Sequence, residues 1–301
     1  MKINYGGKIM KKIIALLMAG LMTATAFAGC GAKKEESGSK ASGSASSSTA
    51  DSTSDSAASS ADWDEIAKKG EMTIGITYFQ PMNYKDDNGE LTGFETEFAQ
   101  AVCAELGVKA KFQEIDWDSK EMELSSKSID CIWNGLTITD ERKQNMDITT
   151  PYMENKQVMV VKAENAEKFT SADALKGASV VAEQGSAGEE VAKGDEFFKS
   201  AEYVAVQSQA SALLEVKSGN ADVAIIDYVM SIGTLTGESD YADLKMVESK
   251  SFSPEQYGIA LRKNSGLTLE KVNAAMDSVA KSGKLAEIAK KYNLSDLLLL
   301  K

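Results

Sequence analysis

The 301-residue sequence contains no histidine and only three cysteines. Without histidine, neither a Ser-His-Asp triad nor a Cys-His pair can form, and the most common metal ligand is missing. Three cysteines are too few for a disulfide scaffold or for a structural zinc site. We therefore expect no metal, no cofactor and no catalysis through a histidine-activated nucleophile.

Basic residues are also scarce. Lysine and arginine together number 33, against 45 aspartate and glutamate residues, which gives a formal net charge of -12. Nucleic-acid binding needs clustered Lys and Arg, and adsorption to anionic lipid needs positive charge, so neither partner is expected. Once the N-terminal region is set aside, about 240 residues remain, which is enough for one large domain or two small lobes.

The N-terminal region has the pattern of a secretory signal. Lys8, Lys11 and Lys12 precede the apolar run Ile13–Phe27, in which small residues gather toward the end. The run is too short for a membrane-spanning helix, and its basic flank is typical of an export signal. The sequence thus predicts a signal peptide over residues 1–29 and an extracytoplasmic protein.

A cysteine follows this signal directly. The segment Phe27-Ala28-Gly29-Cys30 resembles the bacterial lipobox, in which small residues precede a cysteine that is lipidated and becomes the mature N-terminus. Phe27 departs from the leucine that is more common at its position. The alternative is an ordinary signal peptide followed by an incidental cysteine. A lipid on Cys30 would anchor the protein to the cell membrane.

A serine-rich segment comes next. Ser37–Ala61 contains twelve serines among its twenty-five residues, and this composition cannot form a core. A flexible coil of about 30 residues spans on the order of 30 Å, which would hold a folded domain away from a membrane. We therefore assign residues 30–61 to a lipidated cysteine and a disordered tether.

From residue 71 onward, predicted strands alternate with predicted helices. Apolar runs bounded by turn signals predict strands at Glu71–Thr77, Val108–Ile115, Ile129–Trp133, Val158–Val161, Val180–Ala182, Tyr203–Val206, Ala221–Ile226 and Gln256–Arg262. Apolar residues at helical spacing predict helices at Phe94–Leu106, Gly188–Phe198, Ala210–Lys217, 266–281 and 284–291. This alternation implies an α/β fold with mainly parallel sheets, and the restart of the pattern after Lys162 suggests two lobes.

Four segments carry a resemblance to a known family. They are Asn134–Lys143 (Asn-Gly-Leu-Thr-Ile-Thr-Asp-Glu-Arg-Lys), Leu91–Glu95, Lys217–Ala224 leading into Asp227, and Gln256–Ala260. Their order and spacing resemble the amino-acid-binding, periplasmic-type solute-binding proteins (family 3) of ABC importers. The resemblance covers roughly residues 62 to 295.

The resemblance implies a periplasmic-binding-protein-like fold, in which two lobes close on the ligand around a two-strand hinge. The hinge strands would lie near Val160–Lys162 and Ser249–Ser253. Lobe 1 would comprise residues 62–160 plus 253–301, and lobe 2 would comprise residues 161–252. The implied function is that of a monomeric, lipid-anchored protein that captures a polar amino acid and delivers it to the permease subunits of an ABC importer.

An amino acid carries two charges that both need partners when they are buried. The resemblance places Arg142 against the carboxylate, where a planar, permanently charged fork is the best partner. Its alternative is a surface arginine paired with Asp140 or Glu141. Asp227 would hold the ammonium, at the carboxyl end of a strand, where open α/β sheets place ligand contacts. It could also, or instead, be the N-cap of the helix that follows.

Backbone groups complete the implied site. Gly135 would offer its carbonyl to the ammonium, and Thr137 its hydroxyl and amide, unless Asn134 to Thr137 form only a strand-to-loop turn. Ser186 and Ala187 lie in a loop before a helix, where backbone amides would meet the carboxylate. Ala187 replaces a hydroxyl residue that is common in the family, which leaves only its amide for this purpose.

The remaining implied site residues would contact the ligand side chain. Phe79 and Trp117 match positions whose aromatic rings sandwich it, with core packing as the alternative. Glu183 would favour a cationic or hydrogen-bonding side chain, although a solvated surface glutamate fits equally well. The role of Tyr84 stays open. Strand alternation turns Trp133 away from Asn134, so we expect it in the core.

Two further alternatives concern the cysteines and the class of function. Cys103 and Cys131 could form a disulfide, but two buried free thiols are favoured. A dehydratase-like enzyme on the same fold is a competing function, against which the lack of histidine and the intact pair of Arg142 and Asp227 argue. A ligand-sensing module for a signalling partner is another, but such modules are usually fused to a spanning helix. We therefore predict a binding protein and not an enzyme.

Overall fold

A computed structural model describes residues 52–237, 239–247, 250 and 252–301. The predicted signal peptide, the lipidation at Cys30 and the first part of the tether lie outside the described residues. Within the described ranges, every helix is too short or too polar to span a bilayer.

The first sheet contains β1 (Glu71–Ile76), β4 (Lys109–Glu114), β5 (Cys131–Thr137), β6 (Met146–Ile148) and β13 (Glu255–Arg262). Their order is β4-β1-β5-β13-β6, and β7 (Met153–Asn155) also pairs with β13. β4, β1 and β5 are parallel, whereas β13 runs antiparallel to β5 and β6. A short ribbon of β2 (Tyr84–Lys85) and β3 (Leu91–Thr92) accompanies this sheet.

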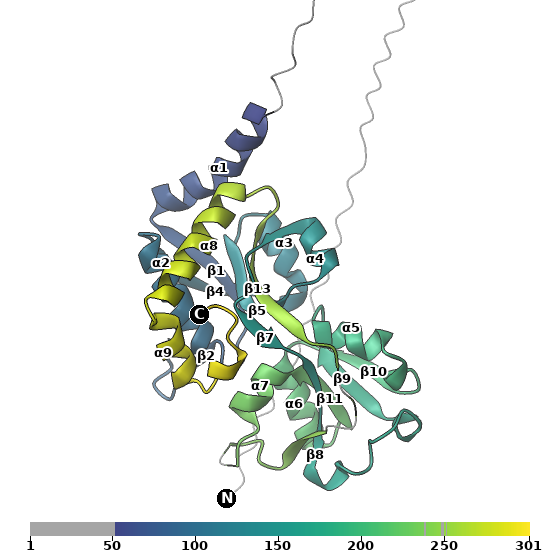
Figure 1. Ribbon diagram of the computed structural model, residues 1–301. Coiled ribbons are helices and arrows are strands. Elements are labelled where there is room, and N and C mark those ends of the chain that lie inside the picture. The colour runs from purple at the N-terminus through teal and green to yellow at the C-terminus, as the bar shows by residue number, and fades with distance from the viewer. Residues whose placement is uncertain (1–51, 238, 248–249, 251) are drawn as a thin grey trace, which may run out of the picture. The chain divides into compact units, whose positions relative to one another are not determined.

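Helices cover both faces of the first sheet. One face is covered by α1 (Ser52–Lys69), α2 (Phe94–Glu105), α8 (Gly266–Lys281) and α9 (Lys284–Lys291), and the other by α3 (Lys120–Ser125) and α4 (Asp140–Asn145) (Figure 1). Alternation along β5 divides the core accordingly: Trp133 packs with α2, whereas Ile132 packs with Leu124 of α3. The Trp133 ring lies edge-on to Phe98, with centroids 5.1 Å apart, so the prediction that Trp133 is a core residue is confirmed. We call this sheet and its helices the first lobe.

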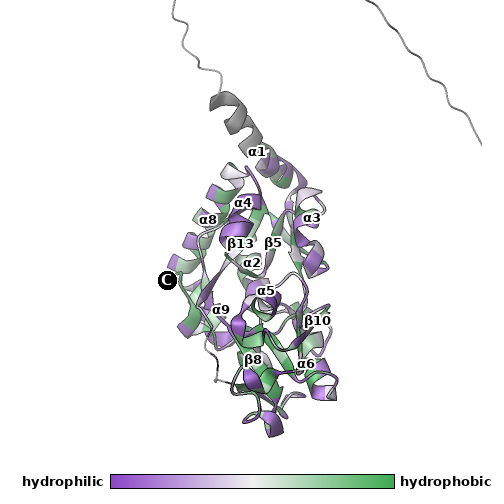
Figure 2. Cartoon of the chain, turned by 90° about the vertical axis from the view of Figure 1, so that its right-hand side faces the viewer, coloured by the Kyte–Doolittle hydropathy of each residue, from purple (hydrophilic) through white to green (hydrophobic). Residues whose placement is uncertain are grey.

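The second lobe is built in the same way. Its sheet contains β8 (Gln157–Lys162), β9 (Ser179–Glu183), β10 (Glu202–Val206), β11 (Val223–Asp227) and β12 (Leu244–Val247), in the order β10-β9-β11-β8-β12. Its helices are α5 (Ala187–Gly194), α6 (Gln209–Ser218) and α7 (Tyr228–Thr234). Figure 2 shows hydrophobic colour on the strands around β8 and much hydrophilic colour on outer helices such as α8.

The two-lobed α/β fold with mainly parallel sheets is confirmed: among the described strands, one in each sheet runs against the others, β13 in the first sheet and β8 in the second. In the second sheet β10, β9 and β11 are parallel, whereas β8 is antiparallel to both β11 and β12.

The crossings between the lobes differ from the expected hinge. β7 pairs with β13 of the first lobe and β8 with β11 of the second, so the chain crosses at Asn155–Gln157. The hinge expected at Val160–Lys162 is therefore wrong, because those residues pair with β11 and β12 inside the second sheet. The second crossing lies between β12 and β13, over residues 248–254, part of which is outside the described residues.

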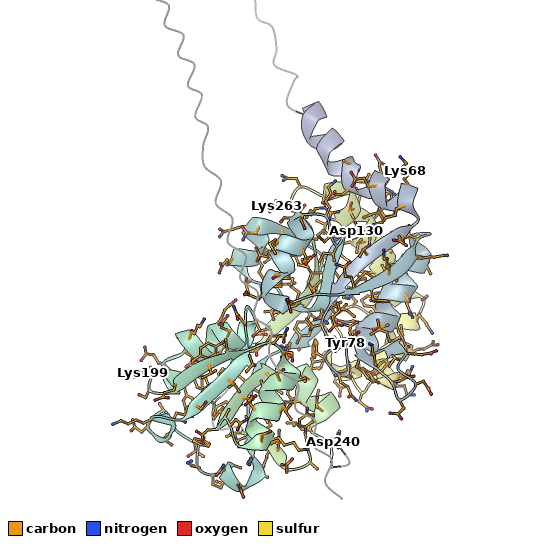
Figure 3. The ribbon with its side chains drawn as sticks, turned by 180° about the vertical axis from the view of Figure 1, so that it is seen from behind. Lys68, Tyr78, Asp130, Lys199, Asp240 and Lys263 are labelled. Carbon is orange, nitrogen blue, oxygen red and sulfur yellow. The ribbon has the colours of Figure 1, made fainter. Side chains whose placement is uncertain are left out.

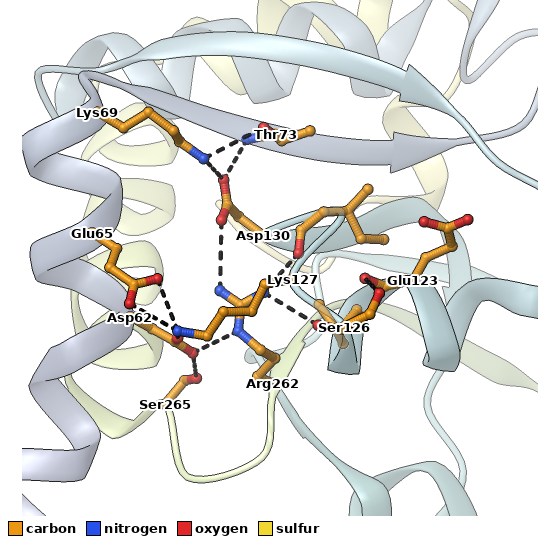
Figure 4. A network of polar contacts seen from close by, with 12 residues as sticks. Asp62, Glu65, Lys69, Thr73, Glu123, Ser126, Lys127, Asp130, Arg262 and Ser265 are labelled. Atoms are coloured by element: carbon orange, nitrogen blue, oxygen red, sulfur yellow. Dashed lines mark hydrogen bonds and ion pairs between the residues drawn. The ribbon is translucent and has the colours of Figure 1, made fainter.

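Helix α1 corrects the expected extent of the tether. It begins at Ser52, so residues 52–61, assigned to a disordered segment, are helical. These residues continue a helix whose later part is fixed to the first lobe by polar contacts (Figure 4). Alanine and serine do not oppose helix formation strongly, so a docked helix can extend into them.

The contacts that fix α1 form one network, drawn in Figure 4. Asp62 accepts hydrogen bonds from Arg262 Nε at 2.8 Å and from Ser265 Oγ at 2.5 Å. Lys69 Nζ lies 2.5 Å from Asp130 Oδ2, and Arg262 Nη2 lies 3.5 Å from the other oxygen of the same carboxylate. The network thereby joins α1 to β13 and to the residue that precedes β5.

The two described cysteines are free thiols, as favoured from the sequence. Cys103 on α2 and Cys131 on β5 are both fully buried and unpaired. Burial raises the pKa of the Cys103 thiol to about 12, so it is an apolar packing group at neutral pH.

Candidate ligand-binding site

One cavity lies between the two lobes, where strands of both sheets end. β1 and β5 end at its first-lobe side, and β9 and β11 end at its second-lobe side. The parallel arrangement within each pair brings their carboxyl ends to one edge. The free space is about 10 Å³, about the room that one water molecule needs. Figure 3 shows side chains of both lobes meeting in this region, near Tyr78.

The structure brings together all of the residues that the sequence nominated for ligand binding. Those that line the cavity are Phe79, Trp117, Asn134, Gly135, Thr137, Arg142, Glu183, Ser186, Ala187 and Asp227. Thr77 and Gln209 also line it and were missed. Thr77 directly follows the end of β1, and Gln209 lies three residues after the end of β10. A polar residue just after a strand is the signal that could have indicated both. Tyr84 lies on β2 and is not among the lining residues.

Arg142 is held in place by its own helix and by carbonyl groups. Thr139 caps α4 and accepts a hydrogen bond from the Arg142 amide at 3.2 Å. The buried guanidinium donates from Nη1 to the Thr137 carbonyl at 2.8 Å and from Nη2 to the Gly185 carbonyl at 3.3 Å. A guanidinium has more N–H donors than these contacts use, so it can still bind an anion.

The alternative for Arg142, an ion pair with an acidic neighbour on α4, is not the arrangement found. Its acidic partner is Glu190 of the other lobe, 3.7 Å from Nη2, whereas Asp140 lies near Lys143. The arginine of the first lobe thus already reaches across the cavity to the second lobe.

Asp227 is surrounded by side-chain amides. Its Oδ1 accepts hydrogen bonds from Asn155 Nδ2 and Gln157 Nε2, each at 2.7 Å, and its Oδ2 accepts one from Gln209 Nε2. Burial raises the pKa of this carboxyl, although the three amides oppose the shift. Asp227 does stand at the N-cap position of α7, but its side chain makes no capping bond. The carboxylate therefore faces the cavity and the crossing strand.

Gly135 occupies a position that only glycine fits. Its φ is 57°, and a Cβ built there would lie 2.8 Å from Phe79 Cε1. The neighbouring Asn134 binds the end of β1, because its Oδ1 accepts from the Thr77 amide at 3.0 Å and its Nδ2 donates to the Thr77 carbonyl at 2.9 Å. Asn134 to Thr137 are thus part of strand β5 and not a separate turn.

A buried carboxylate outside the cavity supports Gly135. Glu95, at the start of α2, accepts hydrogen bonds from the Gly135 amide and from Asn83 Nδ2, both at 2.8 Å, and from the Tyr152 hydroxyl. Burial raises the pKa of Glu95 to about 7. Glu95 was named from the sequence only as the last residue of the segment Leu91–Glu95, so its contact with Gly135 was not predicted.

Trp117 is both a buried residue and a cavity-lining one. Its side chain is 5% exposed and packs with Leu124 and Ile132, yet it also lines the cavity. Lys120, another residue that the sequence did not indicate, lies with Nζ 4.9 Å from the Trp117 ring centroid. The same Nζ donates to the Gly185 carbonyl of the second lobe at 2.9 Å, and burial lowers its pKa to about 8.

Glu183 ends strand β9 and is buried, so the alternative of a solvated surface glutamate is wrong. Its Oε1 has no hydrogen-bond partner within the described part of the chain. Burial, and then the charge of Asp227, raise the pKa of this carboxyl to about 8.

The loop before α5 presents backbone groups to the same space. Ser186 caps the helix, since its Oγ accepts a hydrogen bond from the Glu189 amide at 3.1 Å. Ala187 is the first helical residue, and its amide lies at the positive end of the helix dipole. The Ser186 hydroxyl is therefore occupied by the cap, and the free donors here are backbone amides.

Further contacts join the lobes at the rim of the cavity. Gln184 Nε2 donates to Asp118 Oδ2 at 3.0 Å, and Gln207 Nε2 donates to Asp116 Oδ1 at 3.0 Å. Together with the contacts of Arg142 and Lys120, they hold the lobes against each other.

Fold and site together define a two-lobed binding protein with a polar cavity between its lobes. Residues 72–295 match the model of the bacterial extracellular solute-binding proteins, family 3. The chain belongs to this family.

Several characterised proteins are similar to the chain. The L-arginine-binding protein of Pseudomonas aeruginosa is 31% identical over 225 residues, which is 73% of this chain and 86% of that protein. The L-cystine-binding protein TcyJ of Escherichia coli is 29% identical over 235 residues, 78% of this chain and 86% of that protein.

Solved structures agree with these relatives. An ABC uptake transporter substrate-binding protein from Streptococcus pneumoniae, solved with bound histidine, superposes with a TM-score of 0.73 at 31% identity. The match covers 79% of this chain and 98% of that one. An ancestral amino acid-binding protein, a precursor of cyclohexadienyl dehydratase, superposes with a TM-score of 0.68 at 33% identity, over 76% of this chain and 98% of that one.

Proposed function

We propose that this protein captures a polar amino acid between its lobes and delivers it to the permease of an ABC importer. The observation that carries the proposal is that opposite charges from opposite lobes, Arg142 and Asp227, line one cavity. A free amino acid is the small molecule that brings one carboxylate and one ammonium group to such a pair. The relatives named for arginine, cystine and histidine support the same ligand class.

The contacts of each ligand group follow from the site. The carboxylate would bind the guanidinium of Arg142 and the backbone amides at the start of α5, which together replace its water shell. The ammonium would bind Asp227 and the carbonyl of Gly135. The side chain would lie between the rings of Phe79 and Trp117.

Ligand entry requires the lobes to separate. A free space of about 10 Å³ cannot admit any amino acid, so the bound state would form as the lobes close again on the ligand. The two crossings between the lobes, at Asn155–Gln157 and between β12 and β13, are the proposed hinge. Closure would let the permease distinguish loaded protein from empty protein.

Binding without catalysis is the favoured assignment. The dehydratase alternative gains some support from the ancestral relative that preceded an enzyme. Catalysis of that kind needs an acid free to move protons. Asp227 instead accepts three amide hydrogen bonds, which favour its ionised form and a role as a fixed partner for a cation.

The test is calorimetric titration of the wild type, Arg142→Ala and a control, Lys143→Ala, with a panel of amino acids. Lys143 lies on the same helix but is exposed. Loss of the guanidinium would leave the ligand carboxylate buried without its partner, so Arg142→Ala should lower the affinity by about 100-fold or more. The control should bind as the wild type does. Equal affinity in the Arg142 variant would refute the carboxylate assignment.

We further propose that the protein is a monomer anchored outside the cytoplasm by a lipid on Cys30, with the residues up to Asp51 as its tether. The supporting pattern is the lipobox-like cysteine after an export signal. Cys30→Ser should move the protein from the membrane fraction to the soluble fraction. Retention in the membrane fraction would contradict the lipid anchor.

A further inference from the structure

Three ionisable side chains line the cavity, and the proposed function uses only two of them. Arg142 meets the ligand carboxylate and Asp227 meets its ammonium, which leaves Glu183. This residue belongs to the second lobe, at the end of β9, and its side chain is 4% exposed. A buried carboxylate in a binding cavity must have a partner or it destabilises the closed state.

The protein supplies little that could satisfy Glu183. Its Oε1 has no hydrogen-bond partner among the residues that the structure describes. Lys120, whose charge lowers the pKa of Glu183, donates its hydrogen bonds to the carbonyls of Trp117 and Gly185. A hydrogen bond from Gln209 lowers the pKa of Glu183, but Gln209 also donates to the Asp227 carboxylate and accepts from the Asp227 amide, and Oε1 of Glu183 still has no donor among the described residues. The missing donor therefore has to come from the ligand.

We propose that the ligand is an amino acid with a cationic side chain, whose terminal nitrogen donates to Oε1 of Glu183. This inference rests on the proposed function and names the substrate class of the same site. A guanidinium or an ammonium group supplies both the missing N–H donor and the opposite charge. The faces of Phe79 and Trp117, which line the same cavity, also attract cations.

The environment of Glu183 should couple the binding of a cationic side chain to the release of a proton. Burial and the charge of Asp227 raise its pKa to about 8, while Lys120 and Gln209 lower it. At neutral pH the carboxyl is therefore largely protonated before the ligand binds. A cationic side chain favours the ionised form, so its binding releases a proton, and its affinity rises with pH up to about 8. A neutral side chain leaves the carboxyl protonated and releases none.

A second group titrates in the same range and must be separated from Glu183. Burial, and then the charge of Arg142, lower the pKa of Lys120 to about 8. Comparison of the wild type with Glu183→Gln isolates the glutamate, because the substitution keeps the shape of the side chain and removes its titration and its negative charge. Glu202→Gln, at an exposed position of β10, is the matched control.

The experiment is titration calorimetry with L-arginine, L-lysine and L-glutamine in buffers of different ionisation enthalpy. The wild type should bind arginine or lysine more tightly than glutamine and should release a proton only with the cationic ligands. Glu183→Gln should lower the ratio of cationic to glutamine affinity by about tenfold or more and abolish the release. Glu202→Gln should behave as the wild type, and melting temperatures confirm that each variant is folded.

The outcomes separate the inference from the proposed function. If a neutral amino acid binds most tightly and Arg142→Ala abolishes its binding, the proposed function stands and the cationic class is refuted. An unchanged ligand preference in a folded Glu183→Gln variant also overturns the inference. If the wild type binds no amino acid at all, the proposed function itself fails.

Discussion

At the scale of single residues, Glu95 never reaches the cavity, yet it fixes a residue that does. Its carboxylate receives the amide of Gly135, the side chain of Asn83 and the hydroxyl of Tyr152. Those partners come from a strand, a loop and the segment before the hinge. One buried acid thus fixes the amide of Gly135, the residue whose carbonyl we assign to the ligand ammonium.

Glu95 should also make stability depend on pH. Burial raises its folded-state pKa from 4.5 to about 7, so the folded chain holds this proton more tightly than the unfolded chain. Its contribution to the free energy of unfolding is therefore largest at low pH and falls as pH rises between those two values. Glu95→Gln should flatten this part of the profile. Urea unfolding of both proteins across the range measures the difference, and parallel profiles would contradict the prediction.

The site could be predicted where a residue's chemistry is visible in a short motif. Arg142, Asp227 and the glycine at 135 stand in segments with a recognisable order of residue types. Gln209 lies outside these motifs and is indicated only by its place after a strand end, whereas Lys120 could not be found, because it acts through a contact with a distant part of the chain. For Glu183 the residue type indicated a preference for a cationic or hydrogen-bonding ligand group, but only the structure shows that the side chain is buried and not solvated.

At the scale of elements, α1 depends on charged contacts for its position on the first lobe. Arg262 of β13 joins Asp62 of α1 to Asp130, and its side chain also donates from Nη1 to the Ile129 carbonyl at 2.6 Å. Each carboxylate is nearly buried. Loss of Arg262 would leave Asp62 with Ser265 and with Lys127 at 3.6 Å, whereas Asp130 would keep Lys69 at 2.5 Å.

Arg262→Met should therefore lower the free energy of unfolding by about 2 kcal/mol, because it removes the charged hydrogen bond to buried Asp62 and the donor to the Ile129 carbonyl while keeping most of the side-chain volume. Lys281→Met, at an exposed position near the end of α8, is the control and should have little effect. Denaturant unfolding of both variants gives the values. A loss equal to that of the control would mean that the network does not stabilise the fold.

Element types were more predictable than element partners. The apolar run at Val158–Val161 was recognised as a strand, and it is β8. Its hydrophobicity indicates that the strand is buried, but not in which sheet. The hinge was therefore predicted at Val160–Lys162, several residues after the observed crossing at Asn155–Gln157. The antiparallel pairings of β8 and β13 have the same cause, since they depend on long-range pairing that no local pattern encodes.

At the scale of the whole folded unit, the contacts at the cavity rim join the two lobes through residues that do not line the cavity. Asp116 and Asp118 of the first lobe accept from Gln207 and Gln184 of the second. Such bonds form only in the closed arrangement, so they favour closure and slow its reversal.

The double variant Asp116→Ala/Asp118→Ala should release bound amino acid about threefold faster, because exposed hydrogen bonds are individually weak. The association rate should change less, since affinity changes in related complexes lie mostly in dissociation. Stopped-flow fluorescence of the tryptophans measures both rates. Asp87→Ala, at an exposed turn of the first lobe, is the control. An unchanged dissociation rate would show that the rim contacts do not hold the closed state.

The place of β13 in the first sheet has a consequence for the order in which the two lobes fold. The second lobe is one continuous stretch, from β8 to β12, and all its strands are available once that stretch has left the ribosome. The first lobe is not, because β13 sits between β5 and β6 and comes from the last part of the chain. This interior strand is missing until the whole second lobe has been synthesised, and closing that pairing over more than a hundred residues is slow. The first lobe therefore completes its sheet only after the second lobe has been made, because one of its interior strands follows the second lobe in the chain.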